Sequence, residues 1–333
     1  MKALVLTAPR RLELLDQPRA ELRDGELRLR VEVAGICGSD IHGFAGLNDR
    51  RPVGVVMGHE TVGRVTEPGT SATETFQVGT LVAVNPLTAC GRCRYCLADR
   101  ENLCGHRRLY GCSLELRGGL ASEMVVSTAN CVRLEERDDL LGLAWIEPMA
   151  VGTHAVRLAV TQPGMSVLVV GGGPIGIATA LACVEQQVRP MISEPMNSRR
   201  SLAESLGIPT CTPTELNEMG DQFDVALECV GSGATIRSAV SSVRAGGTIV
   251  CLGLAEAELA ILAVPLIVGE RHLIGSSAYT KRDFEATARW VAGRSEQLAA
   301  LCNPISLAQM PQVFAEYEAG HLQAMKTLYL AEH

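Results

Sequence analysis

The segment SVLVVGGGPIG, residues 166–176, decides the fold of the central part of this 333-residue chain. Ser166 to Val170 are rich in β-branched valine, which predicts a buried strand that runs directly into a glycine-rich turn. The residues that follow, IATALACVEQ, read as a helix. A strand, a glycine-rich turn and a helix in this order are typical of a dinucleotide-binding unit, because the helix N-terminus and the glycine backbone can hold a pyrophosphate. We therefore predict nucleotide contacts from Gly171, Gly173, Pro174, Ile175 and Gly176.

An acidic residue follows about twenty residues later, at the distance that this motif requires. The apolar strand MIS ends at Glu194, whose carboxylate can accept hydrogen bonds from both hydroxyls of an adenosine ribose. The same carboxylate repels a 2′-phosphate, so we expect NAD as the cofactor rather than NADP. Arg199 and Arg200 stand close by, and either guanidinium could stabilise that phosphate. Arg199 is accordingly a further predicted cofactor-binding residue.

The pattern of expected strands and helices differs between this unit and the chain on either side of it. Residues 1–148 contain short strands broken by Gly and Pro, such as ELRLRVEVAG and TLVAVNP, which indicate a β-rich domain. Residues 149–280 alternate apolar strands with helical stretches, which predicts an α/β fold with a doubly wound parallel sheet. After residue 280, DFEATARWVAG reads as a helix and MKTLYLAEH as a strand that returns to the first domain. We therefore expect residues 281–333 to complete the β-rich domain.

The composition and charge exclude several classes of protein. A hydrophobic content of 47% allows buried cores, and the longest apolar runs stay below the roughly 18 residues of a membrane span. The formal charge of −7, without any block of Lys or Arg, argues against nucleic acid and against an anionic membrane as partners. The opening MKALVLTAPRRLELL lacks the apolar core of a secretory signal. We expect a globular protein of the cytoplasm.

Four cysteines share the run NPLTACGRCRYCLADRENLC and stand within fifteen residues of one another: Cys90, Cys93, Cys96 and Cys104. Gaps of two residues let successive sulfurs converge on one ion, and the polar residues between them could not shelter four free thiols. Four protein ligands leave no open position, so the spacing predicts a structural zinc that fixes a lobe without a core of its own.

Three further motifs, ICGSDIH, MGHE and WIEPMAVGTHA, carry the residues of a second metal site: Cys37, His59, Glu60 and Glu147. A thiolate, an imidazole and one carboxylate give three ligands and leave a position for the oxygen of an alcohol. This pattern is typical of a catalytic zinc. The sequence does not decide whether Glu60 or Glu147 is the direct ligand, because either carboxylate could act as ligand or as neighbouring base. We therefore expect two zinc ions per chain.

Taken together, these motifs resemble the zinc-dependent medium-chain dehydrogenase/reductase family over nearly the whole chain. The resemblance implies a lobe with the GroES-like fold, a Rossmann domain, and NAD(P)-linked oxidation of an alcohol or reduction of a ketone. The IEP tripeptide at residues 146–148 is similar to the polyol, threonine and butanediol dehydrogenase branch, in which glutamate takes the place of a cysteine ligand. In this family two subunits join along the last strand of the Rossmann sheet, here near residues 272–277. We therefore expect a homodimer or a homotetramer.

The predicted chemistry is hydride transfer from a secondary alcohol to the nicotinamide. Ser39 and His42 follow Cys37 closely and could relay the hydroxyl proton to water, although His42 could equally cap or pack against a helix. The expected substrate is a polar alcohol or ketone such as a polyol, sugar, cyclitol, diol or amino alcohol, because the charged run from Asn48 to Arg51 lies beside the ligand segment. Candidates for the pocket wall are Phe44, Leu47, Asn48, Arg50 and Tyr279.

Three alternatives remain open from the sequence. The chain could be an NADP-preferring carbonyl reductase of the same fold. It could also be a zinc-independent quinone or enone reductase, although such a protein should lack the set Cys37, His59 and Glu147. Finally, it could bind NAD and zinc without catalysis, which metal analysis with an activity screen would reveal.

Overall fold

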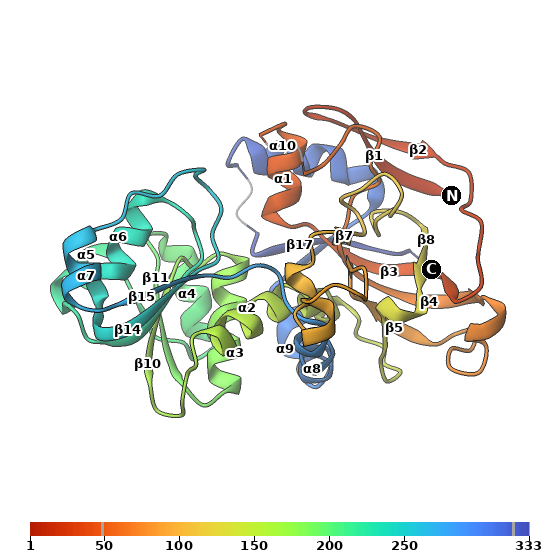
Figure 1. Cartoon of the computed structure of the whole chain (residues 1–333). Helices are drawn as coiled ribbons and strands as arrows, with labels where there is room; N and C mark the ends of the chain where they lie inside the picture. The colour runs from red at the N-terminus through yellow and green to blue at the C-terminus, as the bar shows by residue number, and fades with distance from the viewer. Residues whose placement is uncertain (48–49, 322–323, 333) are drawn as a thin grey trace. The chain divides into compact units, whose positions relative to one another are not determined.

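The computed structural model describes residues 1–47, 50–321 and 324–332 and divides into two compact units (Figure 1). The first unit comprises Met1–Glu147 together with Thr280–His333, and the second comprises Pro148–Tyr279. The sequence placed both boundaries one residue later. We describe each unit by itself.

The second unit contains a six-stranded sheet in which every neighbouring pair is parallel, in the order β12-β11-β10-β13-β14-β15. Its strands are β10 (Ser166–Val170), β11 (Arg189–Ser193), β12 (Thr210–Cys211), β13 (Phe223–Glu228), β14 (Val243–Cys251) and β15 (His272–Gly275). The order reverses between β10 and β13. Because crossovers between parallel strands are right-handed, this reversal sends the two halves' helices to opposite faces of the sheet. The predicted doubly wound sheet is confirmed.

Helices cover both faces of this sheet, as Figure 1 shows for α3 and α6. The helices are α2 (Ile146–Leu158), which begins with the last two residues of the first unit, α3 (Pro174–Glu185), α4 (Asn197–Ser205), α5 (Pro213–Met219), α6 (Gly233–Ser242) and α7 (Ala263–Val268). A proline occupies the first position of α3, where its missing N–H leaves no hydrogen bond unmade. The helix predicted after the glycine turn is therefore present.

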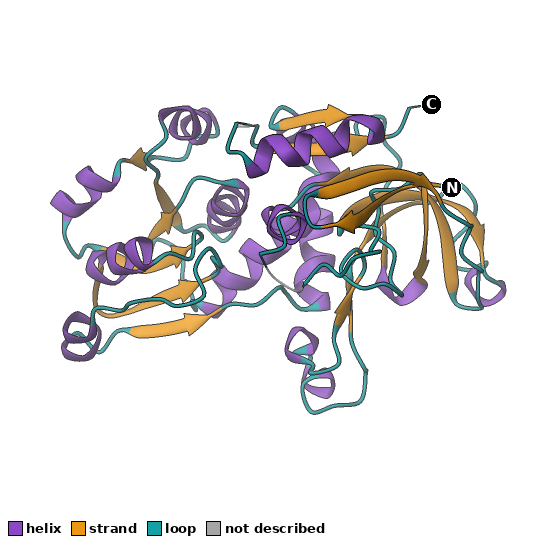
Figure 2. Cartoon of the chain, turned by 90° about the horizontal axis from the view of Figure 1, so that it is seen from above, coloured by secondary structure: helices purple, strands orange, loops and turns teal. Residues whose placement is uncertain are grey.

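The first unit is built on a curved sheet whose strands are orange in Figure 2, in the order β16-β17-β3-β4-β5-β9, with β8 also paired to β3. Its strands are β3 (Glu26–Gly35), β4 (Glu60–Pro68), β5 (Leu81–Val84), β8 (Glu123–Ser127), β9 (Cys131–Arg133), β16 (Cys302–Ile305) and β17 (Lys326–Leu330). Two small sheets pair β1 (Lys2–Ala8) with β2 (Arg11–Asp16), and β6 (Leu87–Thr88) with β7 (Arg108–Leu109). The C-terminal strand β17 pairs antiparallel with β3, with Leu328 opposite Gly35.

The first unit also contains helices. They are α1 (Gly38–Phe44), α8 (Lys281–Ala292), α9 (Ser295–Ala299) and α10 (Met310–Glu318), with 3-10 turns at Thr70–Ala72, Cys96–Ala98, Glu101–Leu103, Thr128–Asn130, Leu141–Trp145 and Leu307–Gln309. Helix α8 begins with a capping box, because the Asp283 N–H donates to Thr280 Oγ1 at 3.2 Å and the Thr280 N–H donates to Asp283 Oδ2 at 3.0 Å. None of the helices in the described part of the chain has the length and apolar character to cross a bilayer.

The core of the first unit lies on the inner face of its sheet. Leu27, Leu29 and Val31 alternate along β3 and are fully buried in this core, so one face of the strand is lined by apolar side chains. Phe44 and Phe314 join α1 to α10 through an edge-to-face ring contact at 5.6 Å. The core thereby fixes α1, which follows directly after the end of β3.

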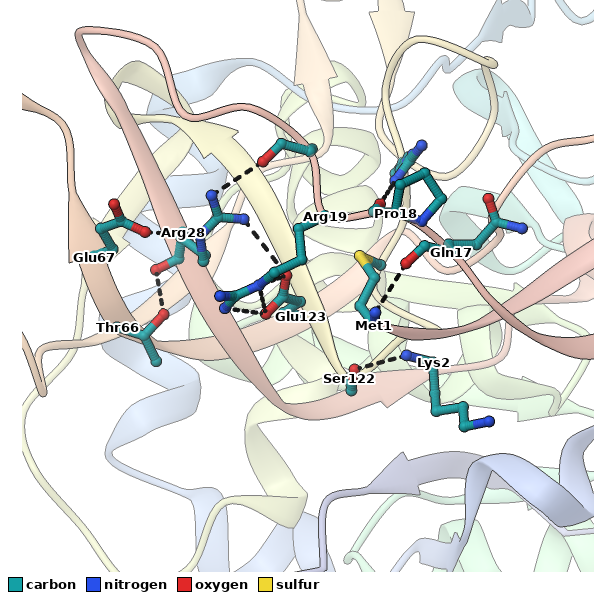
Figure 3. Close-up of polar contacts among 12 residues, drawn as sticks. Met1, Lys2, Gln17, Pro18, Arg19, Arg28, Thr66, Glu67, Ser122 and Glu123 are labelled. Carbon is teal, nitrogen blue, oxygen red and sulfur yellow. Dashed lines mark hydrogen bonds and ion pairs between the residues drawn. The ribbon is translucent and has the colours of Figure 1, made fainter.

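A buried arginine ties the strands of this sheet together on the polar side (Figure 3). The Arg28 guanidinium on β3 contacts Glu67 of β4 at 2.9 Å and Glu123 of β8 at 3.4 Å, and donates to the Ala20 carbonyl at 3.0 Å. Arg19 also binds Glu123, at 2.6 Å. Each carboxylate of this group thus has a cation beside it, so these charges balance one another. The group lies near the start of β3, at the opposite end from α1.

Candidate active site and metal centres

Three predicted ligands converge at the end of β3. Gly35 pairs with Glu60 across the sheet, so Cys37, two residues beyond β3, lies beside the start of β4 and the preceding His59. The ligand atoms of Cys37, His59 and Glu60 all lie within 4.8 Å of one another. His59 and Glu60 are buried, whereas Cys37 is only partly covered. A thiol, an imidazole and a carboxylate at this separation fit one zinc ion with a position left open.

Asp40 contacts both Cys37 and His59 of this cluster. Its carboxylate is fully buried, accepts from the Cys37 N–H at 3.1 Å, and lies 3.3 Å from His59 Nδ1. Arg51 donates to Asp40 Oδ1 from Nε at 2.9 Å and from Nη2 at 2.8 Å. Burial alone raises the pKa of Asp40, but His59 and Arg51 lower it well below its usual range. The ionised carboxylate therefore holds Nδ1 of His59 and leaves Nε2 for a metal, an arrangement common behind zinc-bound histidines.

The same contacts act on His59. Burial lowers the pKa of His59, but Asp40 and the adjacent Cys37 raise it well above the ordinary value. A positive charge is thus strongly favoured at this point, and it can be supplied by a proton or by a metal ion in contact with the ring. The cluster has the electrostatic character of a cation site.

Glu147 lies in the first turn of α2 and is buried. Glu147 is close enough to act on the charge of Lys326 in β17. Burial lowers the pKa of Lys326, but Glu60, Cys37 and Glu147 raise it above the ordinary value. Glu147 therefore belongs to the neighbourhood of the cluster, whereas the ligand atoms that lie within 4.8 Å of one another include Glu60. The sequence analysis did not identify Lys326 or Asp40 as parts of this site, nor the pairing of Arg51 with Asp40. The only local signal was that Asp40 lies in the same motif, GSDIH, that follows Cys37.

The two predicted proton carriers differ in their surroundings. Ser39 Oγ accepts a hydrogen bond from Arg51 Nη2 at 3.1 Å, so the hydroxyl is oriented by the same arginine as Asp40. His42 is half-buried in the last turn of α1. The relay through these residues stays a prediction.

Two expectations about the substrate pocket are wrong. Phe44 was expected in the pocket wall, but it is buried in the core against Phe314, because the short helix α1 turns this side chain inward. Arg51 was expected to add charge for a polar substrate, but it is buried and paired with Asp40. Leu47 and Arg50 are exposed and Tyr279 is buried, while Asn48 and Asp49 lie outside the described residues.

The second group of ligands is the predicted thiolate cluster, whose four sulfurs also lie within 4.8 Å of one another. Cys93 Sγ is 3.5 Å from Cys96 Sγ, and Cys90 Sγ is 3.9 Å from it. Two short 3-10 helices lie between Cys96 and Cys104, and Leu97 in the first of them is 75% exposed. Because this segment exposes an apolar side chain instead of burying it, apolar packing contributes little to its stability. Four convergent sulfurs fit a zinc ion, which could stabilise the segment instead.

The pKa values of two thiols in this cluster are shifted in opposite directions. Hydrogen bonds from the Arg92 and Cys93 backbone lower the pKa of Cys90 to about 6. Loss of solvent and the hydrogen bond with the Cys93 thiol raise the pKa of Cys96 to about 12. Cys90 is therefore the more acidic of the two thiols, and a cation beside Cys96 would favour the loss of its proton.

The nucleotide loop in the second unit has the predicted geometry. Gly171 follows β10 with a φ of +100°, a conformation that favours glycine. A Cβ on Gly176 would lie 1.8 Å from the Gly171 carbonyl oxygen, so α3 can pack this closely only with a glycine there. The turn thus brings the N-terminus of α3, with its free N–H groups, to the end of the strand, where a pyrophosphate can bind.

Glu194 is tied into this loop. Its Oε2 accepts from the Gly172 N–H at 2.7 Å and its Oε1 from the Met196 N–H at 2.9 Å. The two nearby arginines have different roles: Arg200 donates to the carbonyls of Glu194 and Pro195 at 2.9 and 2.7 Å, and Arg199 Nη1 lies 3.8 Å from Glu194 Oε2. Only Arg199 therefore directs its guanidinium toward the Glu194 carboxylate.

Comparison with known proteins identifies the family of this chain. Residues 23–136 match the model of the alcohol dehydrogenase GroES-like domain, and residues 174–293 match the model of zinc-binding dehydrogenases. The chain is 31% identical over 314 residues to 2-dehydro-3-deoxy-L-galactonate 5-dehydrogenase of Pseudoalteromonas atlantica, covering 91% of each chain. It is also 31% identical over 273 residues to L-idonate 5-dehydrogenase of Vitis vinifera, covering 76% of this chain and 74% of that one.

A solved structure supports the same relationship. A protein of Sinorhizobium meliloti 1021, provisionally assigned as a zinc-binding dehydrogenase and bound to NADP, matches 99% of each chain with a TM-score of 0.89 and 29% identity. The likeness therefore extends over both units.

Proposed function

Because the chain belongs to the zinc-dependent medium-chain dehydrogenase/reductase family, we propose that it oxidises a secondary alcohol of a polyhydroxylated substrate, with NAD as the hydride acceptor. The observation that carries this proposal is the convergence of Cys37, His59 and Glu60 within 4.8 Å, with Asp40 behind His59. The relatives named for galactonate and idonate derivatives favour a polyol or sugar acid as the substrate class.

Each residue of the site has a proposed task in this reaction. Cys37, His59 and Glu60 would hold a zinc ion, which would supply the Lewis acidity that makes a substrate hydroxyl easier to deprotonate. Asp40 keeps Nδ1 of His59 occupied and so fixes the ring. Ser39, whose hydroxyl accepts a hydrogen bond from Arg51, would take part in the removal of the hydroxyl proton.

The test is a panel of alcohols supplied with NAD to zinc-loaded protein, with NADH formation followed by absorbance. The expected result is turnover of polyols and sugar acids well above that of ethanol or propan-2-ol. A preference for the simple alcohols would overturn the substrate class, and no turnover on any member would overturn the enzymatic proposal in favour of a binding protein.

We also predict a preference for NAD over NADP of at least about tenfold in kcat/KM. The Glu194 carboxylate is held by two backbone N–H groups, so it cannot swing away easily from a 2′-phosphate that it repels. Kinetics with both cofactors and one substrate measure the ratio. The NADP bound to the relative from S. meliloti makes this comparison necessary.

Two variants separate the contributions to this ratio. Glu194→Gln keeps the shape of the side chain but removes its charge, and should shift the ratio toward NADP. Arg199→Ala should shift it further toward NAD, because Arg199 is the arginine beside the carboxylate. Equal use of both cofactors by the unaltered protein would show that Arg199 dominates.

We further propose a homo-oligomer joined along β15. This strand is the edge of its sheet, and the nearby helix α7 exposes Val264, Ile267 and Val268 by 71%, 72% and 78%. An open strand edge next to exposed apolar side chains is a typical interface between subunits. Sedimentation at micromolar concentration should give a dimer or a tetramer.

A pair of matched variants tests this surface. Ile267→Asp should shift the protein toward the monomer. Leu97→Asp, at a position that is 75% exposed in the other unit, should leave the oligomer unchanged. A monomeric parent protein would contradict the proposal.

A further inference from the structure

Lys326 is a fully buried cation beside the candidate catalytic metal site. Its side chain has 0% exposure, its ammonium forms an ion pair with Glu60 Oε2, and it donates to the Ile36 carbonyl at 3.3 Å. The indole ring of Trp145 covers it at 6.0 Å. A lysine is rarely buried to this extent unless it is paired with an opposite charge.

The sheet is shaped to bring Lys326 and Glu60 together. The two residues belong to β17 and β4, which lie on either side of β3, and Gly35 of β3 stands between them. A Cβ on Gly35 would lie 2.0 Å from Glu60 Oε2 and 2.8 Å from Lys326 Cε. The ion pair therefore occupies the space that a side chain at position 35 would fill, and glycine is required there for room.

The ion pair joins Lys326 to a predicted metal ligand. The ligand atoms of Glu60, Cys37 and His59 lie within 4.8 Å of one another, and the ammonium of Lys326 pairs with Glu60 Oε2. A metal ion in this cluster and the ammonium would therefore share one carboxylate, and the two cations would repel each other.

We propose that Lys326 is a positioning residue of this metal site, which holds Glu60 in place while the site is empty and competes with the metal for its carboxylate when the site is filled. The inference rests on the metal site proposed above. It concerns how strongly that site retains its ion, which the function alone does not determine.

The proposal has two consequences of opposite direction. Removal of the ammonium leaves the buried carboxylate of Glu60 without a partner, so the metal-free protein should become less stable. Without the ammonium of Lys326, the metal has no competitor for the Glu60 carboxylate and is not repelled by a second cation. Metal binding should therefore become tighter. A lysine with a merely structural role would weaken both properties together.

The experiment compares Lys326→Met with the parent protein and with Lys2→Met, a control at an exposed lysine. Zinc affinity is measured by competition with a chelator, counting the zinc bound beyond that retained by Cys37→Ser. The dissociation constant for this zinc should fall by at least about tenfold in Lys326→Met, while thermal unfolding of the protein stripped of it occurs at lower temperature. Lys2→Met should change neither. Unchanged or weaker zinc binding in Lys326→Met would overturn the proposal.

A second variant guards against misfolding. Lys326→Arg keeps the charge and should retain the dissociation constant of the parent protein within about threefold. If Lys326→Met folds only with zinc, the rate of zinc loss to excess chelator replaces the equilibrium measurement and should be slower than in the parent, with a faster rate refuting the idea. A parent protein that binds no zinc beyond that of Cys37→Ser would instead refute the metal site itself.

Discussion

Cys37→Ser is expected to lower turnover by at least about a thousandfold while it leaves the fold intact. The hydroxyl of serine stays protonated at neutral pH and is a poor zinc ligand, so the site loses one of its three converging donors. A loss of this size corresponds to roughly 4 kcal/mol of catalytic stabilisation, in the range that a metal ion supplies. The backbone of residue 37 keeps its hydrogen bond to Asp40, so the start of α1 should persist.

The measurement combines steady-state kinetics with elemental analysis. Zinc should fall from two ions per chain to one, and the thermal unfolding temperature should change by only a few degrees. Cys131→Ser is the matched control, because Cys131 is a thiol of the same unit whose Sγ donates to the Ser127 carbonyl at 3.5 Å. Retention of more than a tenth of the parent activity by Cys37→Ser would show that Cys37 does not hold the catalytic ion.

The parts of this protein that could be predicted from the sequence are those whose residues lie close along the chain. The glycine turn of residues 171–176 and the cysteine run depend on spacings of a few residues, so the local backbone decides what they bring together. Cys37 and His59 are 22 positions apart, yet both flank strands, and the residue types alone suggested a common metal.

The remaining contacts depend on the order of strands, which spacing does not encode. Lys326 meets Glu60 across 266 residues because β17 and β4 both lie next to β3, and no local pattern reports that arrangement. The charged run that ends at Arg51 favours a polar substrate when read from the sequence, but Arg51 is buried and paired with Asp40. Phe44 was assigned to the pocket because it follows the ligand segment, although its direction is set by packing against Phe314.

Cys96→Ser is expected to lower the stability of the whole first unit rather than its chemistry alone. Cys96 Sγ lies within 4 Å of two other sulfurs of the cluster, at 3.5 Å from Cys93 and 3.9 Å from Cys90, so its loss opens the closed ligand set. The segment around it exposes Leu97 and has little apolar packing of its own to replace the metal. Structural zinc contributes on the order of 10 kcal/mol to small domains that depend on it.

This segment also reaches the second part of the first unit, because the Lys281 N–H at the start of α8 donates to the Glu101 carboxylate. Disorder in the lobe should therefore free the end of α8 as well. We expect the unfolding temperature of Cys96→Ser to fall by at least about 10 °C, since one kcal/mol corresponds to roughly 2–4 °C in a domain of this size. Soluble yield should fall with it.

The decisive comparison is with Cys37→Ser, which should also lose one zinc ion per chain. Zinc content by elemental analysis should then match in the two variants, while thermal unfolding should separate them, because only the ion predicted at the four cysteines would order the segment around them. If Cys96→Ser melted within about 2 °C of the parent protein after losing its zinc, the lobe would be ordered by protein contacts alone. The closed thiolate set would then serve some purpose other than stability.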